Sequence, residues 1–98
     1  MAPRPCKRRR IRGRPNSPYF KPAGIRKIDL EESILEPAEF EALRLKDLLG
    51  LDQEECSRRM EVSQPTFHRI LQSARKKTAD AIINGKAIRI LLSQRTSQ

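Results

Sequence analysis

The chain has 98 residues, of which 34% are charged and 4% are aromatic, so it has room for one small domain with a modest hydrophobic core. It contains no run of about 18 apolar residues, which argues against a membrane-spanning helix. Its basic N-terminus is not followed by the apolar stretch of a secretory signal, so we expect a cytoplasmic protein without a membrane partner.

The formal net charge of +9 is divided into blocks along the chain. Residues 1–28 carry a net charge of +10, residues 29–61 carry −7, and residues 62–98 carry +6. The two basic ends favour a polyanionic partner, whereas the acidic middle argues against a uniformly cationic protein that coats membranes.

The first 18 residues are rich in Arg, Lys and Pro and have too few apolar side chains to fold by themselves. We predict a flexible basic arm over residues 1–18 that becomes ordered on a phosphate backbone. The alternative is a solvated tail that only aids solubility. Phosphate contacts in and after this arm are expected from Arg8, Arg9, Arg10, Arg12, Arg14 and Lys21.

The next segments are short. Residues 19–25 read as an extended piece closed by a Pro-x-Gly turn. Residues 26–35 fit neither the helical nor the strand period and stay unassigned. Near the C-terminus, residues 86–92 alternate like a strand, which needs a partner because a lone strand leaves its backbone groups unpaired. The segments near Ile11 or Tyr19-Phe20 are the candidates for that partner.

Helical signals lie between these segments. The first helix is expected to begin near Pro37, which suits a first helical turn, and to end at Gly50. The second is expected over residues 52–60 and the third over residues 64–84, where Asn-Gly is a stop signal. The core contacts of the first helix are expected to come from Leu35, Phe40, Leu43, Leu48 and Leu51.

Residues 52–71 have the spacing of a helix-turn-helix motif. Ser57 is small enough for the crossing of two helices, and Val62 supplies an apolar anchor in the turn. Ser63 is a typical cap for the following helix. Glu61 occupies the turn position where Gly often stands because the backbone needs a positive φ.

The second helix of this motif has two faces. The apolar face at helical spacing comprises Phe67, Ile70, Leu71 and Ala74. The opposite face is basic and hydrogen-bonding, which suits the major groove of DNA, although any αα-corner would show similar spacing. Expected base contacts are Gln64, Thr66, His68, Arg69 and Gln72. Expected phosphate contacts further along are Arg75, Lys76 and Lys77.

Together these signals predict a mainly α fold with a three-helix helix-turn-helix core in a single domain over residues 19–92, followed by a disordered tail over residues 93–98. Short extended segments are expected near residues 19–25 and 86–92. The third helix is longer than a minimal three-helix unit can cover. Its far end, with Ile82 and Ile83, is therefore expected to pack on another subunit or on the N-terminal region.

Catalytic and metal signals are weak. The two cysteines, Cys6 and Cys56, form no CxxC pair, and with one His in the chain we expect no metal site and no cofactor. Cys56 reads as a small buried thiol, and Cys6, in the basic arm, as a candidate reactive thiol. No triad, paired carboxylates or Gly-rich phosphate loop is evident, so we do not expect an enzyme.

Several strings across residues 3–91 resemble a family of small, uncharacterised prokaryotic proteins. These strings are Arg9-Arg10-Ile11, residues 19–25, residues 41–47, Gln53-Glu54-Glu55, Pro65-Thr66-Phe67, residues 73–77 and residues 84–90. The members are described as predicted DNA-binding proteins with a helix-turn-helix like region four of sigma factors. The resemblance implies a DNA-binding role without a settled target.

The leading expectation is a sequence-specific double-stranded DNA-binding protein that regulates transcription, with its third helix in the major groove and its arm on phosphates. We also expect a homodimer, because one helix-turn-helix unit reads only a few base pairs. One alternative is a protein-interaction module that docks on RNA polymerase or other parts of the transcription machinery. Its acidic face would comprise Glu39, Glu41, Asp47, Glu54 and Glu55. Another alternative is RNA binding through the arginine-rich arm.

Overall fold

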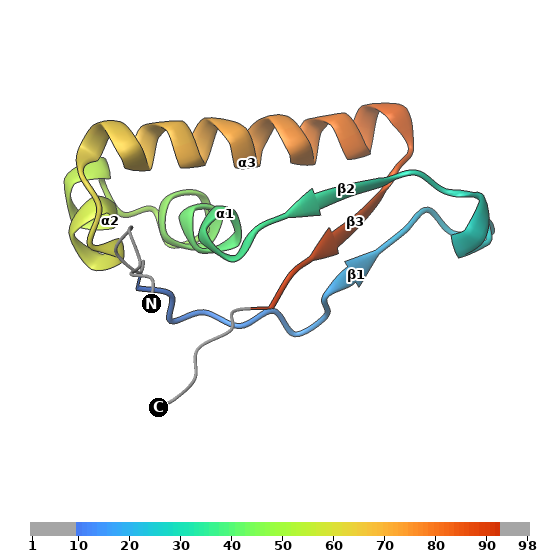
Figure 1. Cartoon of the computed structure of the whole chain (residues 1–98), viewed down its shortest axis with the longest axis horizontal. Helices are drawn as coiled ribbons and strands as arrows, with labels where there is room; N and C mark the ends of the chain where they lie inside the picture. The colour runs from blue at the N-terminus through green and yellow to red at the C-terminus, as the bar shows by residue number, and fades with distance from the viewer. Residues whose placement is uncertain (1–9, 93–98) are drawn as a thin grey trace, which may run out of the picture.

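The computed structural model describes residues 10–92, so the predicted contacts of Arg8 and Arg9, the thiol of Cys6 and the tail over residues 93–98 lie outside it. In chain order the elements are β1 (Tyr19–Phe20), a 3₁₀ turn (Lys27–Asp29), β2 (Glu32–Leu35), α1 (Pro37–Ala42), a π-helical segment (Leu43–Leu48), α2 (Gln53–Met60), α3 (Gln64–Asn84) and β3 (Ala87–Ile90). The long helix α3 spans the molecule, with α1 and α2 beneath one half and the strands beneath the other (Figure 1).

The strands form a three-stranded sheet in the order β1-β3-β2. β3 runs antiparallel to β1, with Tyr19 opposite Arg89, and parallel to β2, with Leu35 opposite Ile90. The predicted strand near the C-terminus is therefore confirmed, and its partner is Tyr19-Phe20 rather than the segment near Ile11. β2 lies in the stretch that the sequence left unassigned.

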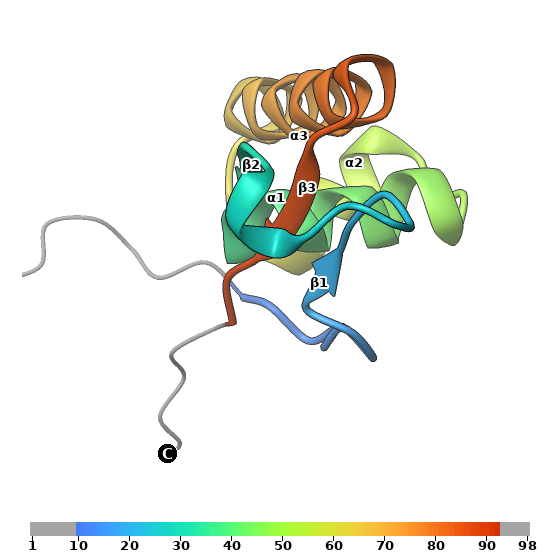
Figure 2. The ribbon, with the colours of Figure 1, turned by 90° about the vertical axis from the view of Figure 1, so that its right-hand side faces the viewer.

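The length of α3 is explained by what lies under it. Its first half contributes Phe67 and Leu71 to a buried cluster with residues of α1, the π-helical segment and α2. Further along, Ala74 packs with Leu35 of β2 and Ile90 of β3 in a second cluster. Figure 2 shows α3 lying over the sheet, with β1 as the strand farthest from it. One helix thus covers both the helical layer and the sheet.

The end of α3 departs from expectation. Ile82 and Ile83 are 73% and 77% exposed, so they do not pack on the N-terminal region that the structure describes. The helix ends where expected, because Gly85 adopts the left-handed conformation with a φ of 69°. Such a C-terminal residue suits Gly because it has no Cβ to clash with the backbone.

The first helix is present but does not stay α-helical. Over Leu43–Leu48 it widens into π-helix, in which the N–H of Leu49 donates to the carbonyl of Arg44, five residues back, at 2.9 Å. A wider turn holds more residues, so the apolar positions after Leu45 leave the buried face. Leu45 is 1% exposed and Leu48 is 77% exposed, so the prediction of Leu48 as a core residue was wrong.

Within the described part of the chain, no helix is both long and apolar enough to cross a membrane.

Candidate nucleic-acid interface

The connection between α2 and α3 is a tight turn. Glu61 follows α2 with a φ of 60°, in the left-handed region where the sequence expected strain for a non-Gly residue. The N–H of Val62 donates to the carbonyl of Ser57 at 3.0 Å, and the Val62 side chain packs against the helical cluster. Ser57 is 5% exposed, in agreement with the expected need for a small residue there.

Ser63 caps α3 as predicted: its Oγ accepts a hydrogen bond from the N–H of Thr66 at 3.2 Å. We expect Ser63→Ala to lower the free energy of unfolding by about 1 kcal/mol, because one helix N–H loses its acceptor. Ser63→Asp, which keeps a capping oxygen, is the matched control and is expected to stay near wild type. Urea denaturation of both variants measures the difference, and equal loss in the two would contradict the role of the cap.

The predicted base-contacting residues divide into two groups. Gln64, His68, Arg69 and Gln72 are exposed on α3, whereas Phe67 and Leu71 are buried. Thr66 is only half-exposed, and its hydroxyl oxygen accepts hydrogen bonds from Ser63 Oγ at 3.0 Å and from Arg69 at 3.4 Å. Thr66 therefore belongs to the cap of the helix, and the remaining polar side chains form an outward surface.

The basic residues further along α3 are separated by the fold. Lys76 is exposed. Arg75 forms a bidentate ion pair with Asp47, and the shorter of the two contacts is 2.6 Å. Lys77 turns toward α1, where its Nζ donates to buried Glu39 at 2.8 Å. Of the three, Lys76 alone presents its charge to solvent without an ion pair among the described residues.

The expected acidic face is not present. Glu39 and Glu41 are 7% and 1% exposed and lie inside the fold. Asp47 is paired with Arg75, and Glu55 is paired with Arg58 and Arg59. Glu54 is the member of that set that is exposed and has no ion pair within residues 10–92. These five residues therefore do not form one acidic face.

The basic arm makes a contact that the sequence did not predict. The backbone N–H groups of Arg12 and Gly13 donate to the carboxylate of Glu41 at 3.2 and 3.0 Å. Arg44 donates to the same carboxylate from Nε and Nη2, at 2.9 and 2.8 Å. Glu41 lies four residues before buried Leu45 on a helix, and this spacing was the available sign that its side chain faces inward.

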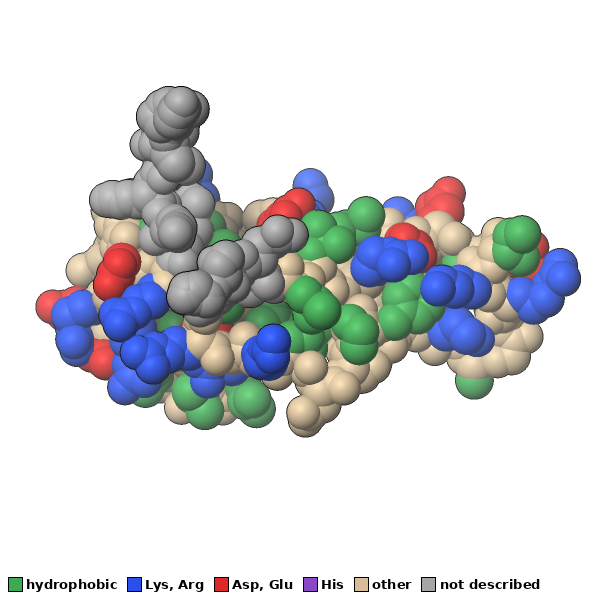
Figure 3. Space-filling model, turned by 60° about the horizontal axis from the view of Figure 1, so that its bottom comes forward, with side chains coloured by type: hydrophobic (Ala, Val, Ile, Leu, Met, Phe, Trp, Pro, Cys, Tyr) green, Lys and Arg blue, Asp and Glu red, His purple; other side chains and the backbone are tan. Residues whose placement is uncertain are grey.

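The arm also reaches the turn between α2 and α3. The N–H of Arg10 donates to the carbonyl of Met60, the last residue of α2, at 3.2 Å. Its guanidinium pairs with Glu61 at 3.0 Å. Arg12 and Arg14 are exposed between this point and the sheet. Figure 3 shows Lys and Arg side chains at both the helical end and the sheet end of this face.

Lys21 is placed apart from these residues. It follows β1, at the sheet end of the molecule (Figure 1), and its Nζ donates to the carbonyl of Ile25 at 2.7 Å. It therefore closes the turn after β1 and does not join the basic side chains at the helical end.

The two buried glutamates predict acid sensitivity. Burial alone would raise the pKa of Glu41, but the hydrogen bonds from Arg44, Arg12 and Gly13 outweigh it, so its pKa lies below the ordinary 4.5. The pKa of Glu39 is lowered against burial in the same way, chiefly by Lys77. A lowered pKa stabilises the fold above pH 4.5, and this contribution is lost as the pH falls from 4.5 through the folded value.

We therefore expect the free energy of unfolding to fall as the pH drops below 4.5, and Glu41→Gln to flatten that dependence. Glu54→Gln removes the same charge from an exposed site and is expected to leave the dependence unchanged. Urea titrations between about pH 3 and 7 measure both variants. A wild-type stability that does not vary over this range would contradict the prediction.

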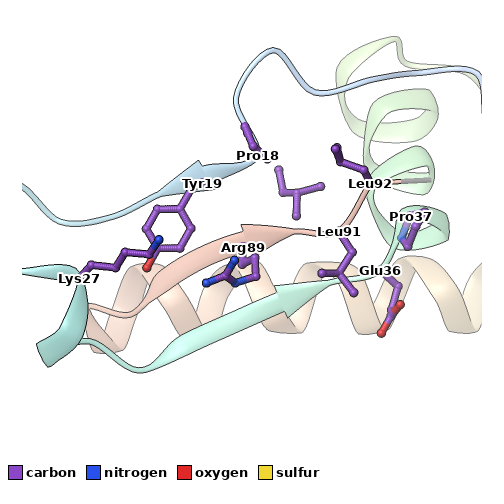
Figure 4. A pocket seen from close by; sticks show the side chains of 9 residues that line it. Pro18, Tyr19, Lys27, Glu36, Pro37, Arg89, Leu91 and Leu92 are labelled. Atoms are coloured by element: carbon purple, nitrogen blue, oxygen red, sulfur yellow. The ribbon is translucent and has the colours of Figure 1, made fainter. Parts of the chain in front are cut away.

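The sheet end carries a separate hollow of about 740 Å³ (Figure 4). Tyr19, Lys27 and Arg89 line it. The Tyr19 hydroxyl donates to Glu32 at 2.9 Å, and Arg89 donates to both carboxylate oxygens of Glu32 at 2.9 and 2.8 Å. The Nζ of Lys27 lies 4.7 Å from the centre of the Tyr19 ring. Since Tyr19, Arg89 and Glu32 come from the three strands, this network ties the sheet together across its strands.

Of the two cysteines, the structure describes Cys56, which is free and buried. Residues 10–92 contain no cluster of three or more His, Cys, Asp or Glu side chains that could hold a metal ion. Cys56 is fully buried as predicted, and burial raises the pKa of its thiol. A raised pKa keeps the sulfur protonated near neutral pH, which suits the expected structural role.

Comparison with known proteins gives relatives over most of the chain. The UPF0251 protein of Caldanaerobacter subterraneus subsp. tengcongensis is 61% identical over 88 residues, which cover 90% of this chain and 75% of the relative. The UPF0251 protein of Dehalococcoides mccartyi strain 195 is 59% identical, with the same coverage of both chains. No solved structure matches the chain. Residues 1–94 match the family model described as a protein of unknown function, DUF134, and the chain therefore belongs to that family.

Proposed function

We propose that the protein binds double-stranded DNA at specific sequences and regulates transcription, with α2, the turn at residues 61–63 and α3 acting as a helix-turn-helix. The observation that carries the proposal is the outward surface of the first turns of α3, formed by Gln64, His68, Arg69 and Gln72. The helix is held from beneath by Phe67 and Leu71, so this surface has a rigid base.

The dimensions and chemistry suit the major groove. That groove is about 12 Å wide and admits an α-helix, whose first turns reach the base edges. A guanidinium can bind guanine through two hydrogen bonds, and a Gln side chain can bind adenine in the same way. We assign Arg69 to the first role and Gln64 to the second, with His68 and Gln72 as further contacts.

The distribution of charge also supports DNA over an alternative partner. Most carboxylates of α1 and α2 are buried or ion-paired, so they do not present the acidic face that docking on the transcription machinery would use. If about five basic residues of the arm contact phosphates, the arm should contribute about −4 to −5 to the log–log dependence of affinity on salt.

Selection of binding sites from random duplexes, followed by sequencing, tests the proposal. For Arg69→Ala we expect a preference lost at one or two base positions, equivalent to about 1–3 kcal/mol of discrimination at each. Arg26→Ala is the matched control, because Arg26 is an exposed arginine near the sheet end that pairs with Asp29. It is expected to leave the selected motif unchanged.

Other outcomes would point elsewhere. Uniform weakening by Arg69→Ala with an unchanged motif would reassign Arg69 to a phosphate contact. Absence of any selected motif would contradict sequence-specific reading. Tighter binding to single-stranded RNA than to duplex DNA would favour the RNA-binding alternative, and recovery of RNA polymerase without DNA would favour the docking alternative.

We further propose that the protein acts as a homodimer, because two-fold pairing doubles the recognised site. β3 is bonded on both sides and offers no free edge, which leaves the exposed Ile82 and Ile83 as the apolar surface on α3. We expect the double variant Ile82→Ser with Ile83→Ser to weaken association in sedimentation equilibrium. Ile28→Ser, at an isoleucine that is 81% exposed elsewhere, is the control. A stable wild-type monomer with full operator affinity would contradict the dimer.

A further inference from the structure

We propose that Glu41 is a positioning residue that anchors the basic arm beside the α2–α3 turn, so that the arm and α3 bind adjacent parts of one DNA duplex. In this arrangement α3 lies in the major groove and the arm lies on the phosphates that flank it. The inference rests on the proposed function and adds to it a second contact surface and the residue that places that surface.

The anchor is built around backbone groups. The Glu41 carboxylate receives hydrogen bonds from the N–H groups of Arg12 and Gly13 and two from the Arg44 guanidinium. Burying a carboxylate is costly unless its oxygens are satisfied, and here both oxygens accept bonds. Because two of the donors belong to the main chain, the carboxylate fixes the path of the arm and leaves the Arg12 side chain exposed.

Gly13 is required for this approach. A Cβ at this position would lie 2.2 Å from Arg44 Nε and 2.9 Å from Glu41 Oε1. Both distances are shorter than real contacts, so any side chain would displace Arg44 from Glu41 or lift the arm away from α1. Gly13 therefore lets the arm pass over the Glu41–Arg44 pair without moving either side chain.

The anchor sets where the rest of the arm leaves the core. Arg10 is bonded to the carbonyl of Met60 and paired with Glu61, two residues before the cap of α3 at Ser63. Figure 1 shows the described chain beginning at this end of the molecule, beside α2. Arg12 and Arg14 follow with exposed side chains. The fold thus holds the guanidinium of Arg10 next to the turn that precedes α3.

The charge of the described arm fits duplex DNA. Residues 10–14 span at most about 17 Å. DNA carries a phosphate charge about every 1.7 Å along its axis, so several phosphates lie within that reach. The Arg10–Glu61 pair is 46% and 56% exposed at its two side chains, so it is weak and a phosphate can replace Glu61.

The first measurement uses the full-length protein without DNA. Amide hydrogen exchange at Arg12 and Gly13 reports the anchor directly, because both N–H groups donate to Glu41. We expect protection in the wild type and at least tenfold faster exchange in Gly13→Ala and Glu41→Gln. Glu54→Gln, which removes the same charge from an exposed site, is expected to keep the protection. Gly13→Ala lies outside the helices, so it releases the arm even if Glu41→Gln does not fold.

The second measurement uses the same variants with a selected duplex. We expect Gly13→Ala to bind about tenfold more weakly at about 0.1 M salt, because a released arm is no longer held at high local concentration beside the DNA. The log–log salt slope should become flatter, and hydroxyl-radical footprints should lose the protected phosphates next to the α3 site. The selected base motif should be unchanged, since α3 is not altered.

The outcomes separate the two proposals. If Gly13→Ala frees the amides but leaves the footprint and the salt slope as in the wild type, the positioning role of Glu41 is overturned and the proposed function stands. The same conclusion follows if replacement of both Arg12 and Arg14 by Ala leaves the slope unchanged. If the wild type binds no duplex while its amides are protected, both the proposed function and the joint surface are overturned.

Discussion

Replacement of Phe67 by Ala is expected to lower the free energy of unfolding by about 3–5 kcal/mol. Phe67 is fully buried at the centre of the cluster in which α3 meets Ala42 of α1, Leu45 of the π-helical segment and Cys56 of α2. Its removal leaves a cavity that these three elements line together. Domains of this size have total stabilities of about 5–15 kcal/mol, so the variant would lose a large part of its stability.

Urea denaturation followed by circular dichroism measures this loss. Phe67→Leu keeps most of the buried volume and is expected to cost less than about 1.5 kcal/mol. Ile28→Ala, at an isoleucine that is 81% exposed, is expected to change the stability by at most about 0.5 kcal/mol. If Phe67→Ala cost no more than Ile28→Ala, the helices would not share the core described above.

Truncation after Gly85 is expected to have the second large effect, because it removes the central strand β3. β1 and β2 have no ladder hydrogen bonds with each other and pair through β3 alone. The truncation also removes Ile90, which packs with Leu35 and Ala74 under α3. We therefore expect the sheet to unfold while much of the helical cluster remains.

Amide hydrogen exchange distinguishes this loss from a general one. In the truncated chain, the residues of β1 and β2 should exchange at least tenfold faster, while amides of α2 and the first half of α3 should keep most of their protection. Truncation after Leu92 leaves β3 in place and is the control, with protection expected throughout the sheet. Retained protection of β2 in the shorter chain would show that it is held by α3 rather than by β3.

The sequence predicted the buried face of α3 around Phe67 but not the sheet around β3. The apolar face of α3, with Phe67 and Leu71, follows from helical spacing and was predicted. The central position of β3 in a sheet was not predicted, because its second partner β2 was not recognised. β2, Glu32–Leu35, has too few residues to show a strand period. A strand of this kind is recognised by its pairing partner, and for β2 that partner is β3, 55 residues later in the sequence.

The candidate site divides in the same way. The cap at Ser63, the left-handed Glu61 and the exposed Arg69 and Gln64 follow from local order along one helix, and the sequence indicated them. The sequence did not indicate the ion pairs of Arg75 and Lys77. Their partners, Asp47 and Glu39, are 28 and 38 residues away along the chain. Composition predicted many surface carboxylates on the first two helices, and the fold buried or paired most of them.

By itself, the sequence determined where the three helices begin, where the second and third end, and the turn between these two. These depend on Pro37, Ser63, Gly85 and apolar spacing, which act within about four residues. Only the tertiary structure decided that β3 lies between β1 and β2 and that the arm is anchored on Glu41, 28 residues from Gly13. Such contacts depend on which surfaces meet after the chain has folded, and no local pattern along the chain encodes that meeting.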